Sequence, residues 1–352
     1  MIKIGAAIAA LSRRRVTAGV VAMLATSPAA LAGGISIPEG AGGALARKQP
    51  VILMDIETVD ACKDATLKLD PAAIQVARLQ VEAQLPRMKR FTVYSVYGDA
   101  AGRKARQLSD TGIAAEVEES QLPAADLRLN ITATVNVERN SDKSKSEEWV
   151  VCTASITYTL TDSKGKVLDD TPHASGTIRT PPPQAGQKLE DMTNVRKRVF
   201  RYDPTADKWK FMGGFEPSDP ESAAALVRKT VESPLKGLVA KLAMALPVTT
   251  EVTALNPSKT QFAVKAGQRN GIFKGTRLII WCEQDDFTYA IADTVAEPTM
   301  DKANLKIVAW NEADPDARAI IDQLRSGGIG DGLRGKLWAT TEGIPLEEML
   351  AP

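Results

Sequence analysis

Apolar and polar side chains alternate along a long stretch in the first half of the chain. From Leu127 to Glu138 every second residue is apolar, and the residues between them are Arg, Asn, Thr or Glu. The same period of two returns from Val150 to Leu160 and, less regularly, from Lys166 to Thr180. Turn-forming residues at 140–143 and 162–165 separate these runs. A period of two is typical of strands with one buried and one wet face, so the sequence predicts three antiparallel strands.

Two other stretches have helical periodicity. Asp70-Pro71 has the form of an N-cap and first helical residue, and the spacing after it predicts a helix that stops at Pro86. Asp219-Pro220 repeats this start, and Pro234 is expected to kink the second helix or restart it with Ser233 as a new cap. The apolar positions are Ala72, Val76, Leu79 and Ala83 in the first helix, and Val227, Val231, Leu235, Leu238, Leu242 and Leu246 in the second.

Shorter runs complete this part of the chain. Val51–Met54 is wholly apolar, which favours a strand buried on both faces, and Phe91–Val96 is the next strand. Asp99 is then expected to cap a short helix. The apolar positions of that helix are Ala101, Ala105 and Leu108. The order of elements predicts an α+β fold, in which a mixed sheet carries helices on one face and leaves the other open to water.

The pattern changes after Pro247 to short strands joined by turns. Turn dipeptides stand at Asn270-Gly271 and Lys274-Gly275. We therefore expect a small all-β, barrel-like domain after the mixed sheet. A short helix at 316–325 and a Gly-rich tail follow, with one last candidate strand at 333–339. The expected barrel strands are 248–255, 262–264, 277–281, 288–295 and 305–310.

The first 32 residues have the organisation of an export signal. Arg13–Arg15 precede an apolar run from Val16 to Leu31. Cleavage is predicted at Ala30-Leu31-Ala32, a small-x-small site, with Gly33 as the first mature residue. The run is shorter than the roughly 20 apolar residues of a transmembrane helix, so the mature chain is expected to have no transmembrane segment. Sec and Tat export both remain open.

The segment 181–218 differs in composition from its neighbours. It is polar, rich in aromatic residues for this chain, and predicts an insertion with a small hairpin at 201–212. Such aromatic residues most often fix a loop to the core, and ligand binding by Tyr202, Trp209 and Phe211 is the alternative. The expected division is a signal peptide at 1–32, a flexible lead-in at 33–50, an α/β domain at 51–246 that includes the insertion, a small β domain at 247–311, and a C-terminal helix and tail at 312–352.

Composition and motifs argue against several classes of activity. With 44 basic and 43 acidic residues the net charge is +1, so no overall field favours nucleic acid. The single histidine excludes any mechanism that needs two. Asp110-Thr111-Gly112 lacks the second loop of an aspartic protease, and 267–276 lacks the residue order of a phosphate loop. Asp55, Glu57 and Asp60 are few oxygen ligands for a cation. We expect no catalytic residue, metal or cofactor.

The three cysteines fit structural positions best. In an oxidising compartment, two of the three residues Cys62, Cys152 and Cys282 could form a disulfide and leave one free thiol. Cys152 lies on the apolar side of its strand and Cys282 follows an apolar run, which favours buried free thiols that pack as small hydrophobes. Their spacing argues against zinc.

Two stretches resemble known families. The first, Val51 to Leu246, resembles the N-terminal α/β domain of curli-secretion lipoproteins, penicillin-binding-protein activators and the Tol-Pal translocation protein, and the middle domain of the flagellar T protein. The carrying pieces are Val51-Ile52-Leu53, RFTVYSVYG from Arg90, AADLRLNITATV from Ala124, LTDSKGKVL from Leu160 and the closing helix. The second, VKAGQRNGIFKGTRLIIW from Val264, resembles the C-terminal domain of the flagellar T protein. The chain departs from the lipoproteins in having no Cys at the cleavage site.

The resemblance implies a two-domain, non-enzymatic protein of the periplasm, peripheral to the outer membrane. It would act in the assembly or scaffolding of an envelope, secretion or flagellar complex through contact with other envelope proteins, with self-association open. The surface expected to bind partners is either the small β domain or the polar sheet face with Thr132, Thr134, Thr153 and Thr157. The alternative is a binding module for a small ligand, glycan or peptidoglycan fragment that uses the aromatic insertion.

Overall fold

The computed structural model describes residues 35–97, 104–108, 114–118, 124–142, 147–180, 200–203, 208–211, 220–284 and 287–349. The expected export signal lies outside these residues, as do Asp99, Ala101, Asp110–Gly112 and Asp219. Most of the expected insertion at 181–218 also lies outside the described residues.

A seven-stranded mixed sheet forms the first half of the described chain. Its strand order is β4-β3-β2-β1-β5-β6-β7, with β1 parallel to both β2 and β5 and the remaining neighbours antiparallel. The predicted three-strand meander is confirmed by β5, β6 and β7. The bounds are β1 Val51–Asp60, β2 Thr92–Tyr97, β3 Lys104–Leu108, β4 Ala114–Glu118, β5 Leu127–Asp142, β6 Glu147–Asp162 and β7 Val167–Thr180.

The expected short helix with Ala105 and Leu108 is wrong. Both residues lie in strand β3, where Ala105 pairs with Val96 of β2 and Leu108 pairs with Ala114 of β4. A short run of apolar residues at helical spacing carries only a weak local preference, and pairing with the free edge of β2 outweighs it.

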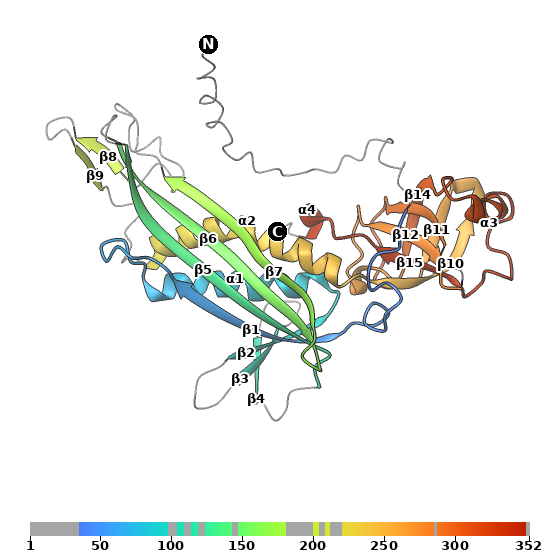
Figure 1. Cartoon of the computed structure of the whole chain (residues 1–352), viewed down its shortest axis with the longest axis horizontal. Helices are drawn as coiled ribbons and strands as arrows, with labels where there is room; N and C mark the ends of the chain where they lie inside the picture. Colours follow the sequence, from blue (N-terminus) through green and yellow to red (C-terminus); the bar gives the residue numbers. More distant parts are fainter. Residues whose placement is uncertain are drawn as a thin grey trace, which may run out of the picture. The chain divides into compact units, whose positions relative to one another are not determined.

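Two helices cover one face of the sheet, side by side (Figure 1). Helix α1 spans Pro71–Gln84 and begins as predicted, because the Asp70 carboxylate accepts the Ala72 N–H at 2.7 Å. Pro86 lies in the short 3-10 helix η2, Leu85–Met88, that follows α1. Helix α2 spans Pro220–Ala245 with Pro234 inside it, so of the two alternatives, a kink or a restart at Ser233, the restart does not occur. All six apolar positions predicted for α2 are buried.

The buried side of α1 is not the predicted one. Leu79, predicted to face the core, is 53% exposed, and Ala72 and Ala83 are exposed as well. The helix has apolar residues on two sides, so spacing alone cannot select the face that meets β1 and α2. The apolar residues that it buries are Ala73, Ile74, Ala77 and Val81.

Strand β1 is buried on one face only, against the expectation of two. Ile52, Met54 and Ile56 are buried, whereas Asp55 and Glu57 are exposed. The predicted apolar run is only the start of a strand that continues to Asp60 with a period of two. Its buried side faces the helices, and its other side belongs to the open face of the sheet.

The second half forms a closed barrel in the order β10-β11-β14-β13-β12-β15, with its own apolar core. The predicted all-β barrel is confirmed. Strand β15, which the sequence places in the tail, pairs with both β10 and β12 and so closes it. The bounds are β10 Thr249–Asn256, β11 Gln261–Val264, β12 Arg277–Cys282, β13 Thr288–Thr294, β14 Ala303–Trp310 and β15 Leu337–Thr341, with helices α3 Pro315–Gly327 and α4 Leu346–Met349.

Residues 35–50, expected to be a flexible lead-in, are packed and hydrogen-bonded. The Ile35 carbonyl accepts the Thr288 hydroxyl at 2.6 Å. The Ala41 carbonyl accepts the Thr249 hydroxyl at 2.8 Å, and the Ala46 carbonyl accepts the Thr249 N–H at 2.7 Å. We call this segment the strap. Its small residues look like a linker, but they let its backbone approach the barrel closely, and Ala41 and Ala46 are buried.

Candidate functional site: the polar face of the sheet

The face of the sheet opposite α1 and α2 is lined by short polar side chains. Register places Thr132 of β5 opposite Thr157 of β6, Thr134 opposite Ser155, and Asn136 opposite Thr153. The four threonines predicted from sequence to bind a partner therefore lie on one face of two adjacent strands. We call this surface the polar face. Its described members on β1, β5 and β6 include Asp55, Glu57, Arg128, Asn130, Thr132, Thr134, Asn136, Glu138, Thr153, Ser155, Thr157, Thr159 and Thr161.

Burial differs sharply between the two sides of these strands. Ile131 and Ile156, which point toward the helices, are 2% and 1% exposed. The threonines that alternate with the buried residues along β5 and β6 are partly exposed. Each hydroxyl can donate one hydrogen bond and accept two, so the polar face offers closely spaced hydrogen-bonding groups. These side chains are short and polar, whereas small-molecule sites are typically concave and lined mostly by apolar side chains.

The rim of the polar face is acidic. Asp55 and Glu57 of β1 are exposed and share rows with Asn130 and Thr132 of β5. Glu138 at the far end of the face is exposed too. Among the described side chains of β1 and β5 on this face, Arg128 is the basic one. The carboxylates would attract a positively charged surface and repel an acidic one.

The aromatic residues proposed as a ligand patch lie in the predicted hairpin. Strand β8, Phe200–Asp203, pairs with β9, Lys208–Phe211. This register sets Tyr202 opposite Trp209 and Phe200 opposite Phe211. The three predicted residues thus belong to two cross-strand pairs of one hairpin, separated by the Arg201–Lys210 pair, in a two-stranded sheet distinct from the one that carries the threonines.

The titratable clusters considered in the sequence do not form a site. Across the described ranges, no group of His, Cys, Asp and Glu residues is placed to hold a metal ion. Asp60 instead accepts the Cys62 N–H at 2.9 Å. The three cysteines are free. Cys152 is buried, and burial raises the pKa of its thiol to about 11, which keeps it protonated and unreactive near neutrality.

Arg90 and the junction around it were missed by sequence reasoning. Arg90 is 2% exposed, and its Nη1 donates to the carbonyls of Ala243 at 2.6 Å and Leu246 at 3.4 Å. Its Nη2 donates to the Gly343 carbonyl, beyond the last barrel strand. The guanidinium therefore caps the C-terminus of α2 and ties it to the barrel. An arginine that directly precedes a strand is usually solvated, so the sequence holds no signal for this role.

Comparisons with known proteins identify no family. No family model and no curated protein matches the chain. Among solved structures, the lipoprotein GNA1162 from Neisseria meningitidis is 14% identical, covering 41% of this chain and 90% of that one, with a TM-score of 0.20. A neuraminyllactose-binding hemagglutinin homolog from Helicobacter pylori is 12% identical, covering 55% and 82%, with a TM-score of 0.24. Likeness at these scores carries no argument about this chain.

Within the described residues, no helix combines the length and apolar character that a membrane crossing requires.

Proposed function

We propose that this chain is an exported, non-enzymatic protein of the cell envelope that acts in assembly or scaffolding through protein–protein contact. The observation that carries the proposal is the polar face. Threonine, serine and asparagine side chains line β5 and β6 in continuous register, on the side of the sheet that faces away from both helices. An extended polar surface of this kind suits another protein surface better than an enclosed small molecule.

The chemistry of the polar face favours a basic, hydrogen-bonding partner surface. Asp55 and Glu57 would meet lysine or arginine side chains of the partner, and the threonine rows would exchange hydrogen bonds with it. Such contacts give specificity and fast association and are weakened by salt. The two bases for placing the protein in the envelope are the export signal expected at 1–32 and the resemblance of the sequence to envelope-assembly domains.

Charge reversal on the polar face tests the proposal. The tagged chain would be used to isolate its partner from envelope extract, and the partner identified by mass spectrometry would be titrated in purified form. In the double variant Asp55→Lys, Glu57→Lys we expect at least tenfold weaker binding with an almost unchanged Tm, since both side chains are exposed.

A matched variant controls for total charge. Glu221→Lys with Asp322→Lys makes the same change at exposed positions on α2 and α3. We expect it to bind like the wild type. Equal weakening by the test variant and the control variant would contradict the polar face as the contact surface. So would a loss of binding in both variants at low salt.

A second candidate function is carried by the hairpin register. Tyr202 opposite Trp209 is an aromatic cross-strand pair of a kind that can stack on a sugar ring. Retention of the chain on immobilised peptidoglycan fragments, lost in Trp209→Ala, would favour a glycan-binding module. Retention that does not depend on Trp209 would remove the hairpin as the ligand site.

A further inference from the structure

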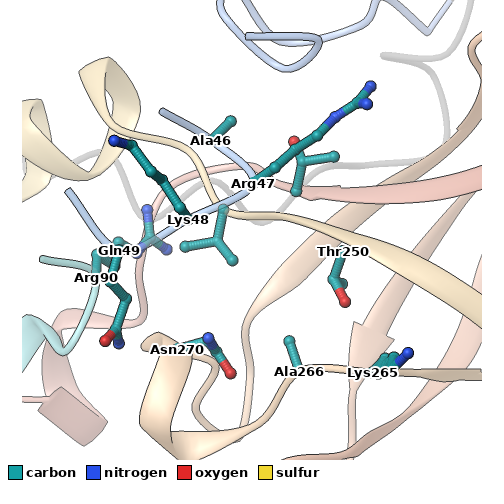
Figure 2. Close-up of a pocket in the computed structure, with 11 residues that line it drawn as sticks. Ala46, Arg47, Lys48, Gln49, Arg90, Thr250, Lys265, Ala266 and Asn270 are labelled. Carbon is teal, nitrogen blue, oxygen red and sulfur yellow. The ribbon is translucent and has the colours of Figure 1, made fainter. Parts of the chain in front are cut away.

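A small cleft lies where the strap, Arg90 and the first part of the barrel meet (Figure 2). Its volume is about 90 Å³, enough for a group of several heavy atoms. Four basic side chains and two amides line it, and no carboxylate does. The polar residues that the argument uses are Arg47, Lys48, Arg90, Thr250, Lys265 and Asn270.

The charge of Arg90 has no carboxylate to balance it. Its three hydrogen bonds go to main-chain carbonyls, and its buried Nε donates to no acceptor among the described residues. Burial lowers the pKa of Arg90 to about 9, and no acidic neighbour counteracts this effect. A buried cation without a counter-charge is costly, and a buried donor without an acceptor adds to that cost.

The turn at Asn270-Gly271 lies directly against this arginine. A Cβ at position 271 would come within 2.7 Å of Arg90 Cγ and 2.2 Å of the Met88 carbonyl, and φ is +70°. Only glycine fits there, and its absent side chain lets the turn approach Arg90 closely. In Figure 2 the Asn270 amide and the Thr250 hydroxyl point toward the middle of the cleft.

The other basic side chains already have partners. Arg47 pairs with Glu283 at 2.7 Å, and Lys48 pairs with Asp126 at 2.6 Å. Lys265 lies 3.8 Å from Glu251 and is exposed. Carboxylates therefore offset the charges of these three residues, whereas Arg90, which also lines the cleft, has no counter-ion.

We infer that the cleft binds a small oxyanion, a phosphate or a carboxylate group, between Arg90 and the Asn270 turn. The anion would provide the counter-charge that the burial of Arg90 requires. Asn270 and Thr250 would donate further hydrogen bonds, and the exposed Lys265 is among the residues that line the cleft. The volume holds one such group, so the rest of a larger ligand would extend outside.

Asn270→Asp is the sharpest test, because it places a carboxylate in the cleft with almost no change in shape. The aspartate retains the oxygen that faces the Gly267 N–H at 3.5 Å. Tm would be followed during titration with inorganic phosphate and, separately, with acetate, against chloride at equal ionic strength. For the wild type we expect a saturable rise of about 2–4 °C. The stronger of the two probes indicates whether phosphate or carboxylate is the natural group.

The variant should start from a Tm above that of the wild type in chloride and show no saturable rise. Asn304→Asp, at an exposed position of β14, is the matched control and should respond like the wild type. Phosphate also stabilises proteins generally by exclusion from their surfaces, but that effect does not saturate and is common to all three proteins. The inference is overturned if the wild type shows no saturable response or if Asn270→Asp responds equally.

A second measurement holds even if Asn270→Asp folds poorly. Backbone amide shifts of the wild type would be followed by NMR during the phosphate titration. Saturable shifts confined to residues 47–50, 249–250 and 265–271 support the site. Shifts spread over the surface, or none, contradict it.

Discussion

The polar face and the junction between sheet and barrel use hydrogen-bonding groups in opposite ways. On the polar face, threonine and asparagine side chains lie partly exposed in regular rows. At the junction, the strap looks like a linker in sequence, yet its carbonyls at Ile35, Ala41 and Ala46 all accept hydrogen bonds from the barrel. Polar groups left available on a regular surface can bind a partner, whereas those hydrogen-bonded within the chain maintain the fold.

The largest expected effect separates the two sides of β6. Ile156→Asp would bury an unpaired carboxylate in the core, which costs several kcal/mol or forces protonation. Thr157→Asp, one residue along, points to the polar face and should change the free energy of unfolding by about 0.5 kcal/mol or less. Thermal and denaturant melts of the two variants measure this. Equal destabilisation would mean that both faces are buried.

Removing the strap should have the next largest effect. A chain that begins at residue 51 loses the hydrogen bonds accepted by the Ile35, Ala41 and Ala46 carbonyls, those donated by Arg47 and Gln49, and the burial of Ala41 and Ala46. The three carbonyl hydrogen bonds and the burial alone are worth about 2–4 kcal/mol. The reference is a chain that begins at residue 33.

Limited proteolysis gives the same comparison a second readout. Leu246, Thr249 and Thr250 are buried, so the reference chain should resist cleavage at 246–250. The shortened chain should be cut there. Equal stability and equal resistance would show that the strap contributes nothing.

A smaller effect, on pH dependence, comes from Cys152 on the helix side of β6. Burial raises its pKa to about 11 from 9.0, so the folded state retains a proton that the unfolded state loses above pH 9. Stability from this group is therefore fully present below pH 9 and declines as pH rises toward 11, by about 1 kcal/mol at pH 10. Cys152→Ala should flatten that part of the stability–pH profile. An unchanged slope would argue that Cys152 is not buried as described.

The long periodic elements could be predicted from sequence because their signal repeats many times. Where burial is described, buried and partly exposed residues alternate along β5 and β6 as their apolar and polar residues do. The apolar positions predicted for α2 are all buried. Pro234 is accommodated inside α2 without a restart. The alternation alone predicts that Thr132, Thr134 and Thr157 lie on one face. The register adds that Thr132 lies opposite Thr157 and Thr134 opposite Ser155.

What could not be predicted depends on neighbours in space. The buried side of α1 is chosen by β1 and α2, not by the spacing of Leu79 or Ile74. The segment with Ala105 pairs with β2 although its local pattern indicates a helix. Arg90 and the strap are fixed by carbonyls and hydroxyls more than 150 residues away in sequence, which composition does not reveal.

Site-specific photocrosslinking tests the central claim most directly. A photoreactive residue would replace Thr157 on the polar face or Arg228 on the exposed side of α2 in the full-length chain. Our account predicts that position 157 crosslinks to one defined envelope protein, that high salt weakens the crosslink, and that position 228 gives none. Crosslinks from position 228 with none from position 157 would place the contact on the helix layer and contradict the account.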